Sequence, residues 1–281
     1  MGAANGRVVG TTQIVNVGLS SKRWDLVIIS EGYQSGQLAQ FATDADSLKN
    51  ALLAAPPFSS MTAAINVFRI DVESTDSGAD EPAACGGSGA TRHTFLDATF
   101  CGNGNLFRYL KVDKSRTILL ANHETPNWNA IVVIVNTPHY GGAALGQVAV
   151  CSKHPQTIDI ALHELGHVFG LADEYEEGLG KYHPPEPASV NVTKKTTPLK
   201  WGSLVLPTTP VPTRVNAACR AYGPTGPVAK GVVGALEGAK GHECNIYRPS
   251  AGCRMRDVGD DFCAVCQDHI RAKLAKFLSV T

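Results

Sequence analysis

The stretch that decides the fold is Ala161–Tyr175, which reads ALHELGHVFGLADEY. It places His163 and His167 four positions apart, with Glu164 directly after the first histidine. On an α-helix, side chains four positions apart lie on one face, so the two imidazoles can bind one Zn²⁺ together. Glu164 would lie beside the ion, where its carboxylate can take a proton from a water molecule. The spacing therefore predicts a metal-binding helix that also carries a general base.

A third protein ligand is expected soon after this helix, because a catalytic zinc ion takes three protein ligands and keeps one position open for water. Asp173 lies six positions past His167, too far along a continuous helix to share the ion. Gly170 can adopt a positive φ, end the helix and turn the chain back. We therefore predict His163, His167 and Asp173 as the zinc ligands. The neighbouring Glu174 is the competing third ligand.

The rest of the chain alternates between strand-like and helix-like segments, which is typical of an α/β fold with a twisted, mixed sheet. Runs rich in β-branched residues predict strands at Gln13–Val17, Leu26–Ile29, Ile65–Val72 and Ala130–Val135. Helices are expected at Gly36–Leu53, Leu106–Val112, Arg116–Ala121, Thr157–Leu171 and Asp261–Leu278. From Tyr182 to Glu243, proline and glycine interrupt the chain and predict little regular structure. We expect a single domain over residues 1–281, with an upper lobe of about 1–175 that holds the sheet and a loop-rich lower lobe of about 176–281.

The composition excludes several classes of protein. The 281 residues carry 25 Lys and Arg against 25 Asp and Glu, so the formal net charge is zero. A nucleic-acid binder, or a protein that binds anionic membranes, would need a basic excess. Hydrophobic residues make up 43% of the chain, enough for a sizeable core. No apolar run approaches the roughly 20 residues that span a bilayer. We expect a monomeric globular protein that binds neither nucleic acid nor membranes.

Eight cysteines in a chain of this length are typical of an oxidising compartment. Met1–Thr12 is polar and rich in glycine, without the apolar segment of a signal peptide. We expect a secreted protein, extracellular or periplasmic, whose leader is absent from this sequence. Cys263 and Cys266 have the C-x-x-C spacing of a zinc site and, with Cys253 and His269, match a second, structural zinc centre. Disulfide bonds are favoured instead, with one of this pair reaching back to Cys253 or to another loop cysteine.

Other residues are candidates for supporting roles at the metal. The phenols of Tyr140, Tyr175 and Tyr247 can each donate a hydrogen bond to a developing oxyanion, although packing is the commoner role of a tyrosine. Val148–Val150 is the candidate edge strand for pairing with an extended peptide.

The zinc-binding stretch resembles that of metzincin-like metallopeptidases, in which a third ligand follows a glycine turn and a methionine turn lies under the metal. More closely, the chain is similar to the IgA-peptidase family of bacterial zinc metallopeptidases. Elements of that family recur here in the same order, over nearly the whole chain. They are Glu31–Tyr33, Asn66–Phe68, Ser74 with Gly78, Val135 and Asn136 with Tyr140–Gly142, Gly170–Tyr175, Tyr247–Ser250, Cys253–Met255 and Phe262–Cys266.

The resemblance implies a zincin-like catalytic domain with an active-site helix and a disulfide-containing C-terminal lobe. It also implies a zinc-dependent endopeptidase that hydrolyses protein or peptide substrates through a metal-activated water, with Glu164 as general base and Met255 in the methionine turn. Two other functions are kept as alternatives. One is a catalytically inactive binding module of zincin fold with a structural zinc, and the other is a metal-dependent hydrolase of another amide. The intact Glu164 argues against the binding module, because a structural zinc site needs no general base.

Overall fold

The computed structural model describes residues 5–104, 106–219 and 222–278. The chain divides into two compact units, one made of Met1–Val168 with Leu274–Thr281 and the other of Phe169–Lys273. Within the described ranges, no helix combines the length and the apolar character that a membrane span requires.

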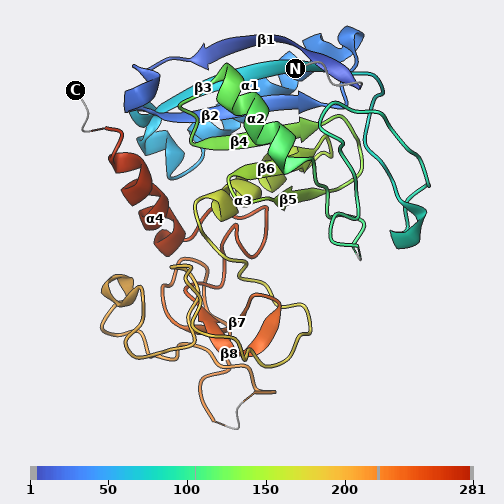
Figure 1. Ribbon diagram of the computed structural model, residues 1–281. Helices are drawn as coiled ribbons and strands as arrows, with labels where there is room; N and C mark the ends of the chain where they lie inside the picture. The colour runs from blue at the N-terminus through green and yellow to red at the C-terminus, as the bar shows by residue number, and fades with distance from the viewer. Residues whose placement is uncertain (1–4, 105, 220–221, 279–281) are drawn as a thin grey trace. The chain divides into compact units, whose positions relative to one another are not determined.

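A six-stranded mixed sheet forms the centre of the first unit (Figure 1). Its strand order is β1-β3-β2-β4-β6-β5. The four inner strands are parallel to one another, whereas the two edge strands β1 and β5 run antiparallel to their neighbours. The strands are β1 (Gly6–Val15), β2 (Trp24–Glu31), β3 (Ile65–Ser74), β4 (Ala130–Val135), β5 (Gly142–Ala144) and β6 (Val148–Ser152).

The inner strands are buried as their sequences predict. Every residue of β2 and of β4 is buried, because both faces of these strands are covered. Continuous β-branched runs of this kind are typical of strands at the centre of a parallel sheet. The alternation of strands and helices expected from the sequence is therefore confirmed for this unit.

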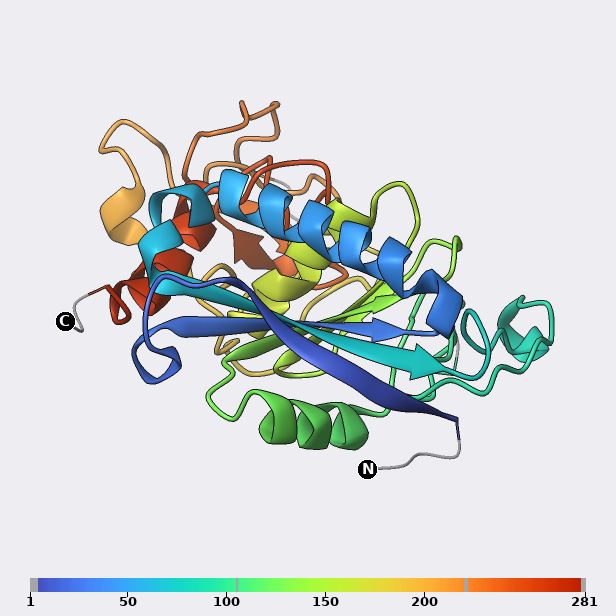
Figure 2. The same ribbon diagram turned by 90° about the horizontal axis from the view of Figure 1, so that it is seen from above.

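Helices cover both faces of the sheet. Helix α1 (Leu38–Ala54) and helix α3 (Thr157–Val168) lie on one face and contact each other, whereas α2 (Lys114–Glu124) lies on the opposite face (Figure 2). Between α2 and the sheet, Leu120 and Ala121 pack in one buried cluster with Val27, Val133 and other strand residues. Short 3₁₀ turns occur at Ser20–Lys22, Ser35–Gln37, Phe58–Ser60, Thr62–Ala64, Ala83–Cys85 and Gly202–Leu204.

The second unit contains little regular structure, as the density of proline and glycine predicts. Its strands β7 (Leu236–Ala239) and β8 (His242–Arg248) form a two-stranded antiparallel sheet, and α4 (Ala264–Ala275) begins in this unit. A disulfide joins Cys219 to Cys244 here, and a second one joins Cys85 to Cys101 in the first unit. The expectation of disulfide bonds is thus confirmed for these pairs.

Two sequence expectations about regular structure are wrong. Leu106–Val112 is not helical over its described residues, because Tyr109 and Lys111 make bridges to Gly142 and Thr99. These backbone bridges, and burial of Leu110, outweigh the helical propensity of the segment. The strands β7 and β8 were both missed, because short strands separated by glycine carry little periodic signal.

The prediction that Val148–Val150 is an edge strand is also wrong. It belongs to β6, which lies between β4 and β5 inside the sheet. After β4 the chain loops outward and returns as β5, which pairs antiparallel with β6. The edge of the sheet beside β6 is therefore Gly142–Ala144, within the glycine-rich segment that precedes the predicted strand.

Candidate metal centre

Helix α3 carries the first two predicted ligands on one face. His163 is buried, with 7% of its surface exposed, and His167 is half-buried one turn later. The two imidazole rings lie edge to face, with centroids 4.9 Å apart. This is the arrangement that the four-residue spacing predicts, because both rings project from the same side of the helix.

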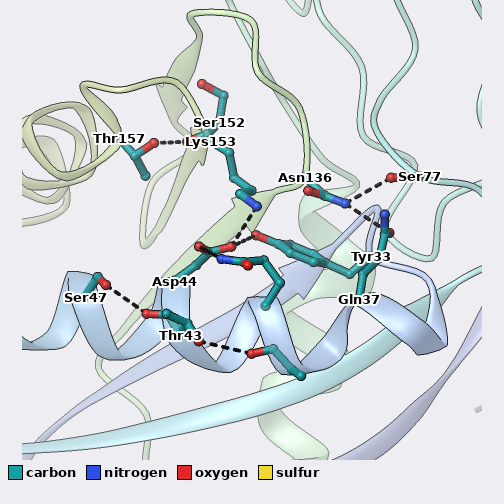
Figure 3. A network of polar contacts seen from close by, with 12 residues as sticks. Tyr33, Gln37, Thr43, Asp44, Ser47, Ser77, Asn136, Ser152, Lys153 and Thr157 are labelled. Carbon is teal, nitrogen blue, oxygen red and sulfur yellow. Dashed lines mark hydrogen bonds and ion pairs between the residues drawn. The ribbon is translucent and has the colours of Figure 1, made fainter.

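A polar network holds the end of β6, from which the chain leads into α3. The Tyr33 hydroxyl donates to Asp44 Oδ2 at 2.8 Å, and Lys153 Nζ lies 3.1 Å from the same oxygen (Figure 3). The Thr157 hydroxyl, in the first turn of α3, donates to the carbonyl oxygen of Ser152 at 2.7 Å. Burial, with the nearby Asp44 charge, raises the pKa of Tyr33 far above its usual value, so this phenol stays a hydrogen-bond donor. The network therefore fixes the direction in which α3 leaves the end of β6.

The end of α3 follows the glycine prediction. The helix stops at Val168, and Gly170 has φ +91°, in the left-handed region that favours glycine. Along this short piece of chain, His163, His167 and Asp173 each offer one ligand atom, and these atoms all lie within 4.8 Å of one another. Two imidazoles and one carboxylate at such spacing match the donor set of a zinc ion.

Glu164 lies beside the edge strand β5. A methyl group built at position 142 would be 3.2 Å from Glu164 Oε1 and 2.5 Å from Ile160 Cγ2. The glycine therefore gives the carboxylate its space. On the neighbouring strand β6, burial raises the pKa of the Cys151 thiol, and the charge of Glu164 raises it further. The sequence did not predict this contact between Gly142 and Glu164. The two residues meet only because strand β5 packs against helix α3 in the folded protein.

Comparison with protein families agrees with this geometry. A family model described as IgA Peptidase M64 matches residues 12–220, more than half of the chain and including the whole of α3. This chain belongs to the IgA peptidase M64 family. The resemblance noted in the sequence is thereby confirmed, and the chain is a hydrolase of the peptidase class. Comparison with curated proteins found no match.

In this M64 peptidase, Glu174 belongs to a different group of side chains from that of His163 and His167. It lies with the thiols of Cys253, Cys263 and Cys266, and the four ligand atoms are within 4.8 Å of one another. All four side chains are buried.

The disulfide expected for the late cysteines is wrong. Cys253, Cys263 and Cys266 are free thiols, with Cys266 Sγ 3.7 Å from Cys253 Sγ and 3.6 Å from Cys263 Sγ. His269, which the zinc alternative included, is absent from this group, since its Nε2 lies 2.9 Å from the carbonyl oxygen of Phe169. The sequence did not predict that Glu174 lies with these cysteines, because the glutamate and the cysteines are far apart along the chain.

Burial sets the acidities of these four groups. It raises the pKa of Glu174 and Cys266 well above their usual values, and it raises the pKa of Cys253 to about 12. Hydrogen bonds from Cys253 and Cys266 lower the pKa of Cys263 to about 6, so one thiol of the group is stabilised as a thiolate.

The remaining candidates lie as follows in the M64 peptidase. Met255 is fully buried, and its carbonyl oxygen accepts a 2.7 Å hydrogen bond from the Glu174 N–H. Tyr247 is buried within β8, while Tyr140 is 38% exposed and packs edge to face on His154. Tyr175 is half-buried, and its carbonyl oxygen accepts from the N–H of Gly241. An oxyanion role stays a prediction for each of these tyrosines.

Proposed function

We propose that this protein is a zinc-dependent endopeptidase in which His163, His167 and Asp173 hold Zn²⁺ and Glu164 is the general base. The observation that carries the proposal is the convergence of two imidazoles and one carboxylate after a helix ended by Gly170. Three protein ligands of this kind leave a coordination position for water, as in catalytic rather than structural zinc sites.

The choice of Asp173 over Glu174 is supported by the second group of side chains. Glu174 Oε1 lies 3.4 Å from Cys266 Sγ and accepts a 2.9 Å hydrogen bond from Asn191. Its carboxylate is therefore engaged away from the two histidines, although it is only one residue from Asp173.

When bound, zinc supplies Lewis acidity toward the scissile carbonyl and the attacking water. Glu164 accepts the proton of that water and then delivers it to the departing amine.

The substrate is an extended peptide or protein segment that pairs with β5. The N–H of Gly142 points away from β6 and donates to the carbonyl oxygen of Arg108 at 3.1 Å. Because strand residues alternate in direction, the backbone groups of Ala144 face the same outer side. Because Tyr109 already bridges to Gly142, an incoming strand would add to this edge at Ala144.

Secretion fits the same proposal. The disulfides Cys85–Cys101 and Cys219–Cys244 suit a compartment in which thiols are oxidised. An extracellular or periplasmic location would also give the enzyme access to foreign protein substrates.

The test is casein hydrolysis by the purified protein, with zinc measured in the same samples. We expect activity that a chelator abolishes and zinc restores. Glu164→Gln should lose activity by about a hundredfold or more while zinc content is unchanged, because only the proton transfer is removed. Glu73→Gln, on the far strand β3, is the matched control and should retain activity.

Two results would contradict the proposal. A zinc-loaded protein that cleaves no protein substrate would favour the binding module. Full activity in the Glu164→Gln variant would remove the general base from the mechanism.

A further inference from the structure

Three cysteines and a glutamate from separate parts of the second unit meet at one buried point. Cys253 lies in the turn before Met255, Cys263 precedes helix α4, and Cys266 lies in its first turn. Glu174 comes from the segment that follows α3. The exposed fractions are 8% for Cys263 and below 1% for the other three side chains.

We propose that Cys253, Cys263, Cys266 and Glu174 form a second, structural metal site that binds a zinc-type divalent cation. In a tetrahedral zinc site, two sulfurs are about 3.8 Å apart, and a sulfur and an oxygen are about 3.5 Å apart. The Sγ atom of Cys266 lies 3.7 Å from that of Cys253 and 3.6 Å from that of Cys263. Glu174 Oε1 lies 3.4 Å from the same sulfur. The three distances from Cys266 Sγ therefore match edges of one coordination tetrahedron, and all four donor atoms lie within 4.8 Å of one another.

The second carboxylate oxygen of Glu174 is evidence that a cation binds at this point. Glu174 Oε2 is buried and has no hydrogen-bond partner among the described residues. A buried carboxylate without full pairing is costly unless it is neutralised or coordinates a metal. The nearby guanidinium of Arg248 is directed elsewhere, since it pairs with Glu176 at 2.8 Å.

Surrounding groups orient the donors as they do around metal ligands. The Asn191 amide donates to Glu174 Oε1 at 2.9 Å, and it is itself held by the backbone of Ala172. The N–H of Cys263 points at Cys253 Sγ at 3.4 Å. Cys263 and Cys266 lie at the N-terminal end of α4, where the helix dipole stabilises thiolates.

The ligand set distinguishes the kind of metal. Thiolates favour zinc and other soft transition metals over magnesium or calcium. Four protein donors, all buried, leave no position for a substrate, which is typical of a structural site. A disulfide is the competing chemistry, but it would use two of the sulfurs and leave the third thiol and Glu174 together without a charge partner.

The site would fix the chain around Asp173, a consequence that rests on the proposed function. Glu174 is the next residue, and its N–H donates to the carbonyl oxygen of Met255 at 2.7 Å. Arg256 donates to the Glu174 carbonyl oxygen at 3.2 Å. A metal on Glu174 and Cys253 would therefore hold the third catalytic ligand and the methionine turn in one arrangement.

Cobalt substitution tests the site directly. The full-length protein, stripped of metal under reducing conditions and reloaded with Co²⁺, should show the charge-transfer absorption of a thiolate–cobalt bond. A His163→Ala/His167→Ala variant should keep this absorption and bind one Co²⁺ per chain, because its cysteines are intact. A Cys263→Ser/Cys266→Ser variant should lose the absorption. Cys151→Ser is the matched control and should keep it, since Cys151 is a buried free thiol outside the group.

Thiol counting makes the test independent of whether the cysteine variant folds. After metal removal and unfolding without reductant, alkylation should modify four cysteines, namely Cys151, Cys253, Cys263 and Cys266. Modification of only two would indicate a disulfide in the group and overturn the proposal. Absence of thiolate–cobalt absorption from the histidine variant would overturn it as well.

These outcomes separate the two metal sites. If the unmodified protein binds one cobalt and loses it in the histidine variant, the second site is wrong and the proposed function stands. If it binds one cobalt with thiolate absorption and the histidine variant keeps it, the catalytic zinc site is wrong and the second site stands.

Discussion

At the scale of single residues, the site depends on where carboxylates lie rather than on how many there are. Asp173 and Glu174 are neighbours in sequence, yet each is grouped with different donors. Asp173 lies with the two histidines of α3, whereas Glu174 lies with Cys253, Cys263 and Cys266. The spacing after Gly170 favoured Asp173 and kept Glu174 as a competitor, because both carboxylates are chemically able to bind zinc.

Gly142 matters because the position has no room for a side chain. We predict that Gly142→Ala lowers kcat about tenfold to a hundredfold, because its methyl group would clash with Ile160 Cγ2 at 2.5 Å and press on Glu164 Oε1 at 3.2 Å, which moves the carboxylate-bearing turn of α3 away from β5. Zinc content should not change, since no ligand is touched. Steady-state kinetics on a peptide substrate, with metal analysis, measures both. Gly36→Ala is the control, as a methyl group there meets nothing within 4 Å, and equal activity in both variants would refute the prediction.

Glu31 makes stability depend on pH. Burial raises its pKa from 4.5 to about 7, although the N–H groups of Leu96 and Ala98 donate to its carboxylate and pull the other way. Because the folded state holds the proton more tightly, this contribution to stability is complete below pH 4.5 and is lost as pH rises to about 7. The loss corresponds to about 3 kcal/mol.

Urea unfolding of the unmodified protein and of Glu31→Gln between pH 4.5 and 7.5 measures this effect. The free energy of unfolding of the unmodified protein should fall relative to that of the variant as pH rises. A relative increase over the same range would show that the N–H groups outweigh burial.

At the scale of elements, the end of α3 determines whether the three proposed ligands can meet. The helix brings the histidines together on its own, through its 3.6-residue period. It cannot bring the aspartate, which needs a break in the helix. Gly170 provides that break, and a methyl group there would meet no atom within 4 Å, so the glycine is required for its backbone conformation.

We predict that Gly170→Ala weakens zinc binding about fivefold to tenfold. A left-handed conformation costs a non-glycine residue about 1 kcal/mol or more, and part of that cost shifts the chain away from the metal-bound arrangement. Competition with a zinc-binding dye measures the affinity. Gly170→Asn should be closer to the unmodified protein, because asparagine tolerates positive φ. If alanine and asparagine were equally harmless, the turn would not control ligand placement.

At the scale of the whole molecule, the two units are stabilised differently. The first has a continuous buried core beneath a six-stranded sheet. The second has few strands and relies on specific links, among them Cys219–Cys244 and the ion pair between the buried Arg248 and the half-buried Glu176. Small apolar cores usually need such covalent or metal links to fold.

Removing the disulfide of the second unit should therefore destabilise that unit. The Cys219–Cys244 bond closes a loop with a sequence separation of 25, and its loss in Cys219→Ser/Cys244→Ser should cost about 3 kcal/mol. Trp201, which is buried in this unit, reports its unfolding by fluorescence once Trp24 and Trp128 are replaced by phenylalanine. Cys85→Ser/Cys101→Ser, in the same background, should leave the Trp201 transition near its original midpoint. An unchanged transition in the first variant would contradict this view of the second unit.

The sequence by itself determined what depends on local periodicity. The central strands, helices α1 and α3, the paired histidines and the glycine-ended helix all follow from spacing over fewer than about 20 residues. The family was also readable from motifs in order along the chain, and the match over residues 12–220 confirmed it.

Tertiary structure alone decided the contacts between residues distant in sequence. It placed β5 rather than β6 at the edge, gave Gly142 its role beside Glu164, and collected Glu174 with three late cysteines. The Leu106–Val112 segment became a bridging loop for the same reason, because pairing with other strands outweighed its own propensity. Such contacts arise from how the chain packs in three dimensions, and one sequence carries no local signal that reports them.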